Sequence, residues 1–580
     1  MDICPVVTTT QPALDNKQIV SVLKLTMQLM ELHEENAFKI RGYQSAINSI
    51  EREGKPLADL DLTQLQEFSG IGKSIAEGIV TIRETGTHPP LQKLLEETPQ
   101  GILEILEIKG LGPKKIKVLW QELEITSTHE LMEACQSGQV AKIKGFGEKT
   151  QESIIQALEY RASNKGKWLY ADVEVLGEEL QAELEKLGDR EWIAAVGPYG
   201  RMSEIVDSIS FLIGTDQAQS ILKKINDLDG WEQEAALSSP YRWQGYWKGE
   251  DIPVIIFLST KANFLRQKLL KTSSSMHLQA PAEDGQTLGQ HFYLAGFTSE
   301  QDAYEKAGFS YLPAPLREGN GELDWIKSHA ISELLTVDDL TGPLHNHSTY
   351  SDGRHSLKEM AEYCRDSGFS YLGIADHSKS AFYANGLDED RILQQHKEID
   401  TLNEALAPFR IFKGIESDIL IDGSLDYSTD VLASFDYIVA SIHSGLNMDI
   451  NKATARLIRA IQHPFTTILG HPTGRLLLRR EGYPIDHRTV IDACAEYKVV
   501  IEINANPWRL DLDWRWVRYA MDKGVLLSIN PDAHEKKGFA DMKYGVIAGR
   551  KGGLTKDMTL NTKTTEELAQ YFESRKNKIQ

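Results

Sequence analysis

The chain has 580 residues, of which 41% are hydrophobic and 25% charged, values typical of a globular protein with roughly two to four domains. Its formal net charge of −21 argues against binding nucleic acid through overall positive charge, although local basic clusters can still contact phosphates. Four cysteines form no CxxC pair, and no signal pattern or run of about 18 apolar residues is visible, so we expect a cytoplasmic protein without disulfides, thiolate zinc or a membrane span.

Charge and histidine are unevenly distributed along the chain. Residues 1–170 contain 19 Lys and Arg against 23 Asp and Glu, a net charge of −4, so the other 410 residues carry −17. Six of the 16 histidines precede residue 340 and ten follow it. The first third is therefore nearly balanced in charge, and histidine is concentrated in the last 240 residues.

The first third predicts helices joined by glycine turns. Residues 17–53 show the apolar spacing of amphipathic helices. The pattern apolar-x-Gly-apolar-Gly, followed by a helix, then occurs three times, from Phe68, Ile108 and Ile143. Such turns expose backbone N–H groups at a helix N-terminus, where an anion is favoured. We therefore predict three helix-hairpin-helix units that bind the DNA backbone without reading sequence, although the glycines could also serve only to close helical hairpins. The candidate DNA contacts are Gly70, Gly72, Lys73, Gly110, Gly112, Lys114, Lys115, Gly145, Gly147 and Lys149.

From these motifs onward the chain resembles a bacterial family X DNA polymerase. The resemblance rests on the second and third hairpins and on "LPAPLREGNGELDW" at Leu312–Trp325, and it covers nearly the whole chain. It implies a multidomain protein with a helical domain at 1–95, a fingers-like helical domain at 96–165, an α+β nucleotidyltransferase-like palm and thumb at 166–325, and a linker at 326–340. In relatives with deoxyribose-phosphate lyase activity a lysine follows the "AE" of the first hairpin. Here that position is Gly78, which offers no amine for a Schiff base, so we do not expect this activity.

The palm-like region lacks the family's metal-binding carboxylates. Ser208 and Ser210 stand where the family has two of its metal-binding aspartates, and Ile255 stands where it has the third. Asp207 is displaced by one residue, which sends a strand side chain to the opposite face. Serine hydroxyls and an isoleucine cannot hold two ions about 3.5–4 Å apart. We therefore predict a palm fold without polymerase chemistry, and an active polymerase remains the alternative if this alignment is displaced.

Seven short apolar runs in the last 240 residues each end in a polar residue that can bind a metal. The runs are GPLHNH, YLGIADH, IFKGIE, YIVASIH, TTILGH, VVIEIN and LLSINPDAH, spaced 27 to 39 residues apart with helical stretches between them. A strand plus a helix takes about 30 residues. Ligands at the C-terminal ends of successive parallel strands are typical of a barrel active site, and seven units predict a distorted (β/α)7 barrel.

Histidine and carboxylate at these strand ends predict a metal centre. His345 and His347, two residues apart, face the same side of a strand and can reach one ion. A lone buried histidine is more often structural, but six or seven on successive strand ends favour metal binding. Imidazole and carboxylate suit zinc, manganese or iron.

The motifs HNHSTYSDG, ADHS, GIESDIL, SIHSG, GHPTGR and PDAH resemble a polymerase-and-histidinol-phosphatase (PHP) domain, here at residues 341–580. The resemblance implies up to three divalent ions, with Glu416 suited to bridge two of them. Asp352 lies in a Ser-Asp-Gly loop that a plain turn would also explain. The implied ligands are His345, His347, Asp352, His377, Glu416, His443, His471, Asp532 and His534.

The predicted chemistry is hydrolysis of a phosphate ester by metal-activated water. The candidate catalytic residues are Glu416, Asp532, His534 and Arg475, the last as a phosphate clamp because guanidinium binds oxyanions bidentately. Arg456 and Arg509 are second candidates for the clamp, and a structural ion pair is the alternative for each arginine.

Two classes of function follow. We expect a DNA-binding, metal-dependent phosphoesterase that acts in DNA repair on gaps or 3′ ends, as a 3′–5′ exonuclease or a 3′-end phosphatase. The alternative is a phosphatase acting on a small, histidinol-phosphate-like monoester. DNA is the only partner that the sequence indicates, with no protein partner and no membrane.

Overall fold

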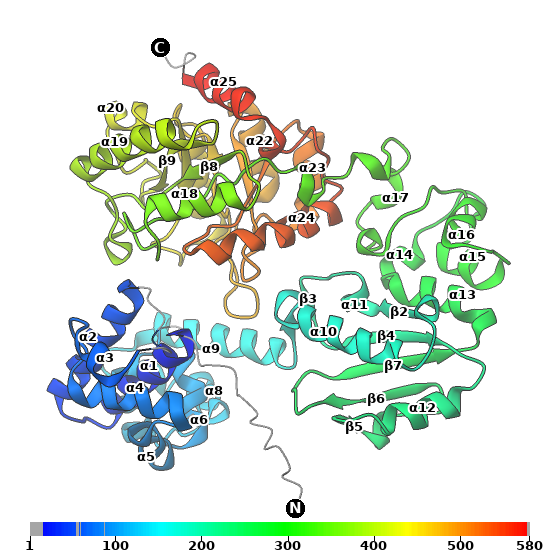
Figure 1. Cartoon of the computed structure of the whole chain (residues 1–580), viewed down its shortest axis with the longest axis horizontal. Coiled ribbons are helices and arrows are strands. Elements are labelled where there is room, and N and C mark those ends of the chain that lie inside the picture. The colour runs from blue at the N-terminus through cyan, green and yellow to red at the C-terminus, as the bar shows by residue number, and fades with distance from the viewer. Residues whose placement is uncertain (1–15, 54–56, 58–59, 86, 109, 577–580) are drawn as a thin grey trace, which may run out of the picture. The chain divides into compact units, whose positions relative to one another are not determined.

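The computed structural model describes residues 16–53, 57, 60–85, 87–108 and 110–576 (Figure 1). The chain divides into two compact units, Met1–Ser163 and Asn164–Gln580. Residues 1–15, which include Cys4, and Lys109 of the second hairpin lie outside the described residues. Among the described residues, no helix is long and apolar enough to cross a membrane.

The N-terminal unit is helical, and its helices share one apolar core. The helices are α1 (Asn16–Leu32), α2 (Ala37–Glu53), α3 (Leu62–Gln66), α4 (Lys73–Thr85), α5 (Pro89–Glu97), α6 (Gln100–Leu106), α7 (Pro113–Leu123), α8 (Thr128–Gln136) and α9 (Gly147–Asn164). Buried apolar side chains from Ile19 to Leu158 form a single cluster, so helices expected in 1–95 and in 96–165 pack on a common core. The separate bounds of these two domains stay a prediction.

The first part of the second unit is an α+β fold on a five-stranded mixed sheet of order β2-β4-β7-β6-β5. The strands are β2 (Ile193–Val196), β4 (Ile209–Gly214), β7 (Val254–Ser259), β6 (Arg242–Trp247) and β5 (Trp231–Gln233). Strands β4 and β7 are parallel and the other pairs are antiparallel. Along β4, Phe211 packs in one apolar cluster and Leu212 in another, because successive side chains point to opposite faces of the sheet.

Helices cover both faces of this sheet. They are α10 (Tyr170–Glu185), α11 (Gly197–Gly200), α12 (Ala218–Asn226) and α13 (Lys261–Thr272). A short antiparallel pair, β1 (Trp168–Leu169) and β3 (Ile205–Val206), lies beside them in the sequence. This mixed α+β arrangement is the palm-like fold that the sequence predicts.

A small group of helices follows the palm and contains the motif at Leu312–Trp325, whose Arg317 holds this group together. Its helices are α14 (Ser275–Gln279), α15 (Leu288–Leu294), α16 (Glu300–Lys306) and α17 (Glu322–Trp325). The wholly buried Arg317 forms an ion pair with Glu300 and donates to the carbonyl oxygen of Leu312 at 2.8 Å. The expected linker 326–340 is packed rather than loose, since Leu335 is fully buried and its N–H donates to Leu554 at 2.9 Å.

The last part of the chain is a curved sheet of six parallel strands with helices around it (Figure 1). The strands are β8 (Tyr371–Ile374), β9 (Arg410–Asp418), β10 (Tyr437–Ser441), β11 (Ile468–Leu469), β12 (Val500–Asn504) and β13 (Leu527–Asn530). The helices are α18 (Leu357–Asp366), α19 (Glu389–Leu406), α20 (Thr429–Ala433), α21 (Ile450–Ile461), α22 (His487–Tyr497), α23 (Val517–Asp522), α24 (Met542–Lys551) and α25 (Thr565–Lys576). Successive strands are neighbours, as expected for βα units.

The seventh predicted strand, around residues 343–347, is an extended segment without a full ladder. It joins both edges of the sheet, because Ala375 donates its N–H to Asn346 at 2.8 Å and His347 donates to Ala533 at 2.9 Å. Pro343 has no N–H, and the N–H of Leu344 donates to the side chain of Asn530 instead of to a strand carbonyl. The predicted distorted (β/α)7 barrel thus consists of six regular strands and this extended segment.

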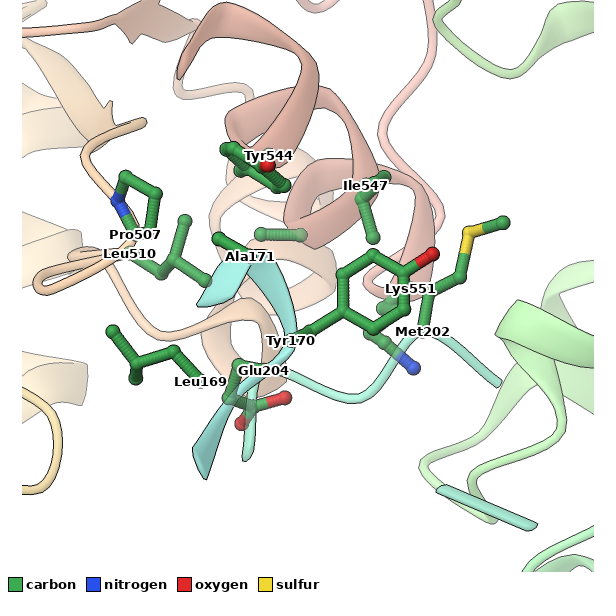
Figure 2. A pocket seen from close by; sticks show the side chains of 11 residues that line it. Leu169, Tyr170, Ala171, Met202, Glu204, Pro507, Leu510, Tyr544, Ile547 and Lys551 are labelled. Atoms are coloured by element: carbon green, nitrogen blue, oxygen red, sulfur yellow. The ribbon is translucent and has the colours of Figure 1, made fainter. Parts of the chain in front are cut away.

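Buried polar contacts join the palm to the last domain. Lys551 on α24 donates from Nζ to Glu318 Oε1 at 2.7 Å, and Trp514 Nε1 lies 3.1 Å from both carboxylate oxygens of Glu204. Figure 2 shows the pocket at this contact, which is lined by Leu169, Tyr170 and Met202 from the first part and by Leu510, Tyr544 and Ile547 from the second. The palm and the sheet of parallel strands thus form one packed body.

Candidate active site

The predicted ligands converge at the C-terminal ends of the parallel strands. Glu416 lies on β9, His443 follows β10 and His471 follows β11. Asp532 and His534 follow β13, and Asp532 adopts a positive φ of 53° that turns the chain there. Because parallel strands end at one edge, side chains from successive strands, 27 to 39 residues apart in sequence, meet in space.

Glu416 lies at the centre of the cluster. Its Oε1 lies 3.0 Å from His471 Nε2, 3.1 Å from His443 Nε2 and 3.3 Å from His345 Nε2. Its Oε2 lies 2.9 Å from His377 Nδ1 and 3.7 Å from His347 Nε2. One carboxylate therefore reaches five imidazoles, as a group that bridges two ions would.

Three sets of side chains place their ligand atoms within 4.8 Å of one another. The sets are His347, Asp352, His377 and His534; His345, His347 and Asp532; and His377, Glu416 and His443. His471 joins through Glu416, so the structure brings together all nine predicted ligands. Their binding of an ion stays a prediction.

The carboxylates of the cluster stay ionised, and despite burial they raise the pKa of His443 to about 10 and of His534 to about 9, so these rings would release a proton when a metal binds. Burial raises the pKa of Glu416, but His443 and His345 hold it well below its usual value. The pKa of Asp532 is likewise kept low by His345 despite burial. Burial, His534 and His377 lower the pKa of His347 to about 3, which keeps its ring neutral. Ionised carboxylates beside a neutral imidazole are the states that bind a metal ion.

Several buried polar atoms of the cluster lie close together without forming hydrogen bonds, which also fits a metal. Within the described part of the chain, His345 Nε2, His347 Nδ1, His377 Nδ1, His471 Nδ1 and Glu416 Oε2 accept or donate no hydrogen bond. Buried polar atoms are normally satisfied, so this many at one place need another partner. The donor set of imidazole and carboxylate suits zinc, manganese or iron and therefore fits the divalent ions implied by the sequence.

Two carboxylates that the sequence analysis did not assign hold the histidines in place. Glu502 Oε2 accepts from His345 Nδ1 at 2.7 Å, and Asp418 Oδ1 accepts from His443 Nδ1 at 2.5 Å. Such partners fix the tautomer and the ring orientation of a metal ligand. Asp418 lies two residues after Glu416 on the same strand face, and this spacing is the signal that could have found it.

The predicted role of Arg475 as a phosphate clamp is corrected by the structure. Its Nη1 lies 2.5 Å from Asp513 Oδ2 and its Nε donates to the carbonyl oxygen of Arg509 at 2.8 Å, so its donors are occupied. Arg456 likewise donates to main-chain carbonyls, including Leu420 at 2.8 Å. The sequence could not show this because Asp513 is 38 residues away.

Arg509 is the arginine that reaches the cluster. Its Nε lies 3.6 Å from Asp532 Oδ2, and its side chain is 21% exposed. The guanidinium of Arg509 donates no hydrogen bond to another residue in the described part of the chain. It is thus available to an oxyanion at the open side of the site, where the side chains of Asp352 and His534 are 35% and 36% exposed.

The three glycine turns of the N-terminal unit share one geometry. The first glycine of each has a positive φ, namely 90° at Gly70, 91° at Gly110 and 96° at Gly145, which favours glycine. The apolar residue between the glycines donates its N–H to the carbonyl three residues earlier, at 3.1 Å in each case: Ile71 to Phe68, Leu111 to Ile108 and Phe146 to Ile143. Gly72 and Gly112 precede helices, whereas Gly147 already begins α9.

The lysines beside these turns differ in their partners. Lys73 lies 3.9 Å from Glu77 and Lys114 lies 3.6 Å from Glu31, while Lys115 Nζ donates to Gly110 at 3.3 Å. Lys144 and Lys149 are exposed and form no ion pair in the described part of the chain. The lysines of the third hairpin are therefore the ones most available to bind a phosphate.

The two serines and the isoleucine of the palm share one sheet face. Ser210 on β4 is opposite Ile255 on β7, and Ser208 Oγ lies 3.2 Å from Ser210 Oγ. Asp207 is exposed and accepts from Ser208 Oγ at 3.0 Å. Two residues beyond Ile255, the ring of Phe257 is contacted by Lys271 Nζ at 3.5 Å from its centroid.

At Gly78, where the family resemblance places the lyase lysine, packing leaves no room for a side chain. A Cβ atom at Gly78 would lie 2.8 Å from Cε1 of His88, and His88 Nε2 is hydrogen-bonded to Tyr43 at 3.0 Å. A longer side chain there would displace the buried His88.

Family models match the hairpins and the last domain. A helix-hairpin-helix domain matches residues 14–88, a SAM-like helix-hairpin-helix tandem matches 102–159, and a PHP domain matches 343–506. Together with the site geometry, these matches define a multidomain, DNA-binding phosphoesterase of the PHP type.

The DNA polymerase/3′-5′ exonuclease PolX of Bacillus subtilis (strain 168) is 32% identical over 570 residues, covering 96% of this chain and 99% of that protein. The chain belongs to this family of X-type polymerases with a C-terminal PHP domain. Probable phosphatases of Thermoanaerobacter sp. (strain X514) and Caldanaerobacter subterraneus subsp. tengcongensis are 27% and 23% identical over 248 residues, which cover 40% of this chain and 95% and 92% of theirs.

Proposed function

We propose that this protein is a metal-dependent phosphoesterase that shortens or trims DNA at 3′ ends, and that its palm no longer polymerises. The observation that carries the proposal is the contrast between two sites of one chain. The strand-end cluster keeps its carboxylates and histidines, whereas the palm has Ser208, Ser210 and Ile255 on the face where carboxylates are expected. The name of the Bacillus subtilis relative supports a 3′–5′ exonuclease.

The nine ligands would hold divalent ions, which would supply positive charge to the phosphate oxygens and activate water for attack at phosphorus. The chain's own residues do the rest. Arg509 orients a phosphate oxygen, which is favourable because guanidinium donors match the oxyanion. His534, the most exposed histidine of the cluster, transfers a proton to or from solvent at the open side.

The helix-hairpin-helix turns hold the DNA. The three turns share one glycine geometry, and the exposed Lys144 and Lys149 of the third turn supply charge for phosphates without reading bases. The palm retains its fold as a further scaffold. The neutral side chains of Ser208, Ser210 and Ile255 support loss of polymerase chemistry, since they bring no negative charge to hold a magnesium ion.

A second candidate is hydrolysis of a small phosphate monoester, which the two probable phosphatases favour. Mass spectrometry of the products separates the two. We expect nucleoside monophosphate from an oligonucleotide with a 3′ hydroxyl, and loss of this product in Glu416→Ala. Release of phosphate from a small monoester at a far higher kcat/KM than from any oligonucleotide would favour the second candidate instead.

A further inference from the structure

Two neighbouring aromatic side chains lie exposed at the mouth of the cluster. Phe382 is 88% and Tyr383 is 71% exposed, on the single 3-10 turn Phe382–Ala384 in the loop between β8 and α19. The ring centroid of Tyr383 lies 6.2 Å from that of His377, a predicted ligand. Single exposed aromatics are ordinary, but an adjacent pair beside a reaction centre marks a contact surface.

Hydrogen bonds within the protein hold the loop that carries Phe382 and Tyr383. Gly386 donates its N–H to Ala381 at 3.1 Å, and Leu387 donates to His377 at 2.9 Å. Arg391 Nη1 donates to the carbonyl oxygens of Asn385 and Gly386 at 2.8 and 3.2 Å. The two rings are thus presented to solvent by a fixed backbone, which lowers the entropy lost when something binds to them.

We propose that Phe382 and Tyr383 form a nucleobase-binding site, on which the unpaired base next to the scissile phosphate of a DNA 3′ end stacks. This inference rests on the proposed function. A phosphodiester held by the cluster necessarily has a base within one nucleotide, and Tyr383 is the aromatic ring beside His377. Stacking on aromatic side chains accepts every base, because each has a π face. The pair therefore selects single-stranded or frayed 3′ ends over paired ones.

Two oligonucleotides that differ only at the 3′ terminus test the site. One ends in a normal nucleotide and the other in an abasic tetrahydrofuran residue. With Mn²⁺, the wild type should prefer the first by about tenfold or more in kcat/KM, mainly through KM, as expected for one stacked base. Phe382→Ala with Tyr383→Ala should abolish this preference without slowing cleavage of the abasic substrate.

Two control variants sharpen the result. Tyr383→Phe keeps the ring and should keep the preference, and Tyr293→Ala removes a tyrosine of similar exposure, 65%, on α15 and should change nothing. A wild type without base preference, or a preference that survives the double substitution, overturns the proposal.

A binding measurement is independent of hydrolysis. In EDTA, an oligonucleotide with a 3′-terminal 2-aminopurine should lose fluorescence on the wild type by stacking, and the double variant should not quench it. Equal quenching by both proteins overturns the base site, even where DNA is cleaved. Quenching specific to the wild type, without cleavage of any oligonucleotide when Mn²⁺ is added, supports the base site and refutes the proposed function.

Discussion

His345 and Glu502 form a fully buried pair in which Nδ1 of the histidine donates to Oε2 of the glutamate at 2.7 Å. The carboxylate can only accept, so Nε2 is the atom left to face Glu416 at 3.3 Å and Asp532 at 3.7 Å. Glu502 thereby selects the tautomer of His345 that a metal ion needs.

Replacing Glu502 by glutamine should weaken metal binding without removing a ligand. We expect the affinity for Mn²⁺ to fall by about 10- to 100-fold, because the partner of a ligating histidine sets its orientation and basicity. Titration of the metal-free protein by calorimetry measures this. Glu404→Gln, on the exposed side of α19, serves as control, and equal affinities in both variants would disprove the role of Glu502.

The contrast between the nine clustered side chains and Glu502 shows what local sequence can predict. All of the clustered residues except Asp352 lie at the end of an apolar run, and strand ends in a parallel sheet meet at one edge, so their convergence was predictable. The role of Glu502 depends on a contact with a residue 157 positions away. The same limit applies to Arg475, whose partner Asp513 comes from another strand-end loop.

The glycine turns were predictable for a different reason. Their geometry is local: a positive φ at Gly70, Gly110 and Gly145 and a hydrogen bond spanning three residues. In contrast, the seventh strand is incomplete because the side chain of Asn530 accepts the hydrogen bond from the N–H of Leu344. An apolar run alone could not show that a side chain, rather than a neighbouring strand, would bind this N–H group.

Carboxylates introduced at Ser208, Ser210 and Ile255 should create a metal site in the palm. These positions share one face, so three aspartates there would repel one another without an ion. In a Glu416→Ala background, we expect the triple aspartate variant to gain a Mn²⁺ site and to be stabilised by Mn²⁺. Electron paramagnetic resonance counts the bound ions. A palm site in the parent without the aspartates would contradict the proposed loss.

Neutralising the lysines of the third hairpin should weaken DNA binding in a salt-dependent way. For Lys144→Gln and Lys149→Gln, we expect each substitution to reduce the slope of log K against log salt by about one, with equal effect on all sequences. Fluorescence anisotropy at several salt concentrations provides the slopes. The control is Lys93→Gln on α5, which lies 3.8 Å from Glu97. Identical slopes for all three would argue against phosphate contact by this hairpin.

The contact between palm and barrel should depend on pH through Glu318. Burial raises the pKa of Glu318, but Lys551 and Arg201 hold it below the usual 4.5. Because the folded pKa is lower than the unfolded one, the pair stabilises the protein above about pH 4.5 and this contribution is lost as the pH falls further.

Glu318→Gln should therefore destabilise the protein at neutral pH by about 3 kcal/mol or more, since it leaves the buried Lys551 without its counter-ion. The urea midpoint of the second unit, measured at pH 7 and at pH 4, reports this. We expect a clear drop at pH 7 and a smaller one at pH 4. Glu250→Gln, in an exposed turn, should have no effect, and a pH-independent loss would refute the linkage.

The fate of a 5′-labelled primer on a template tests the division of labour between barrel and palm most directly. With Mn²⁺ and all four deoxynucleotides, we predict progressive shortening from the 3′ end, no product longer than the primer, and no shortening by His345→Ala or Glu416→Ala. Extension of the primer would contradict the loss of polymerase chemistry at Ser208, Ser210 and Ile255. Shortening that survives both substitutions would contradict the barrel cluster as the hydrolytic site.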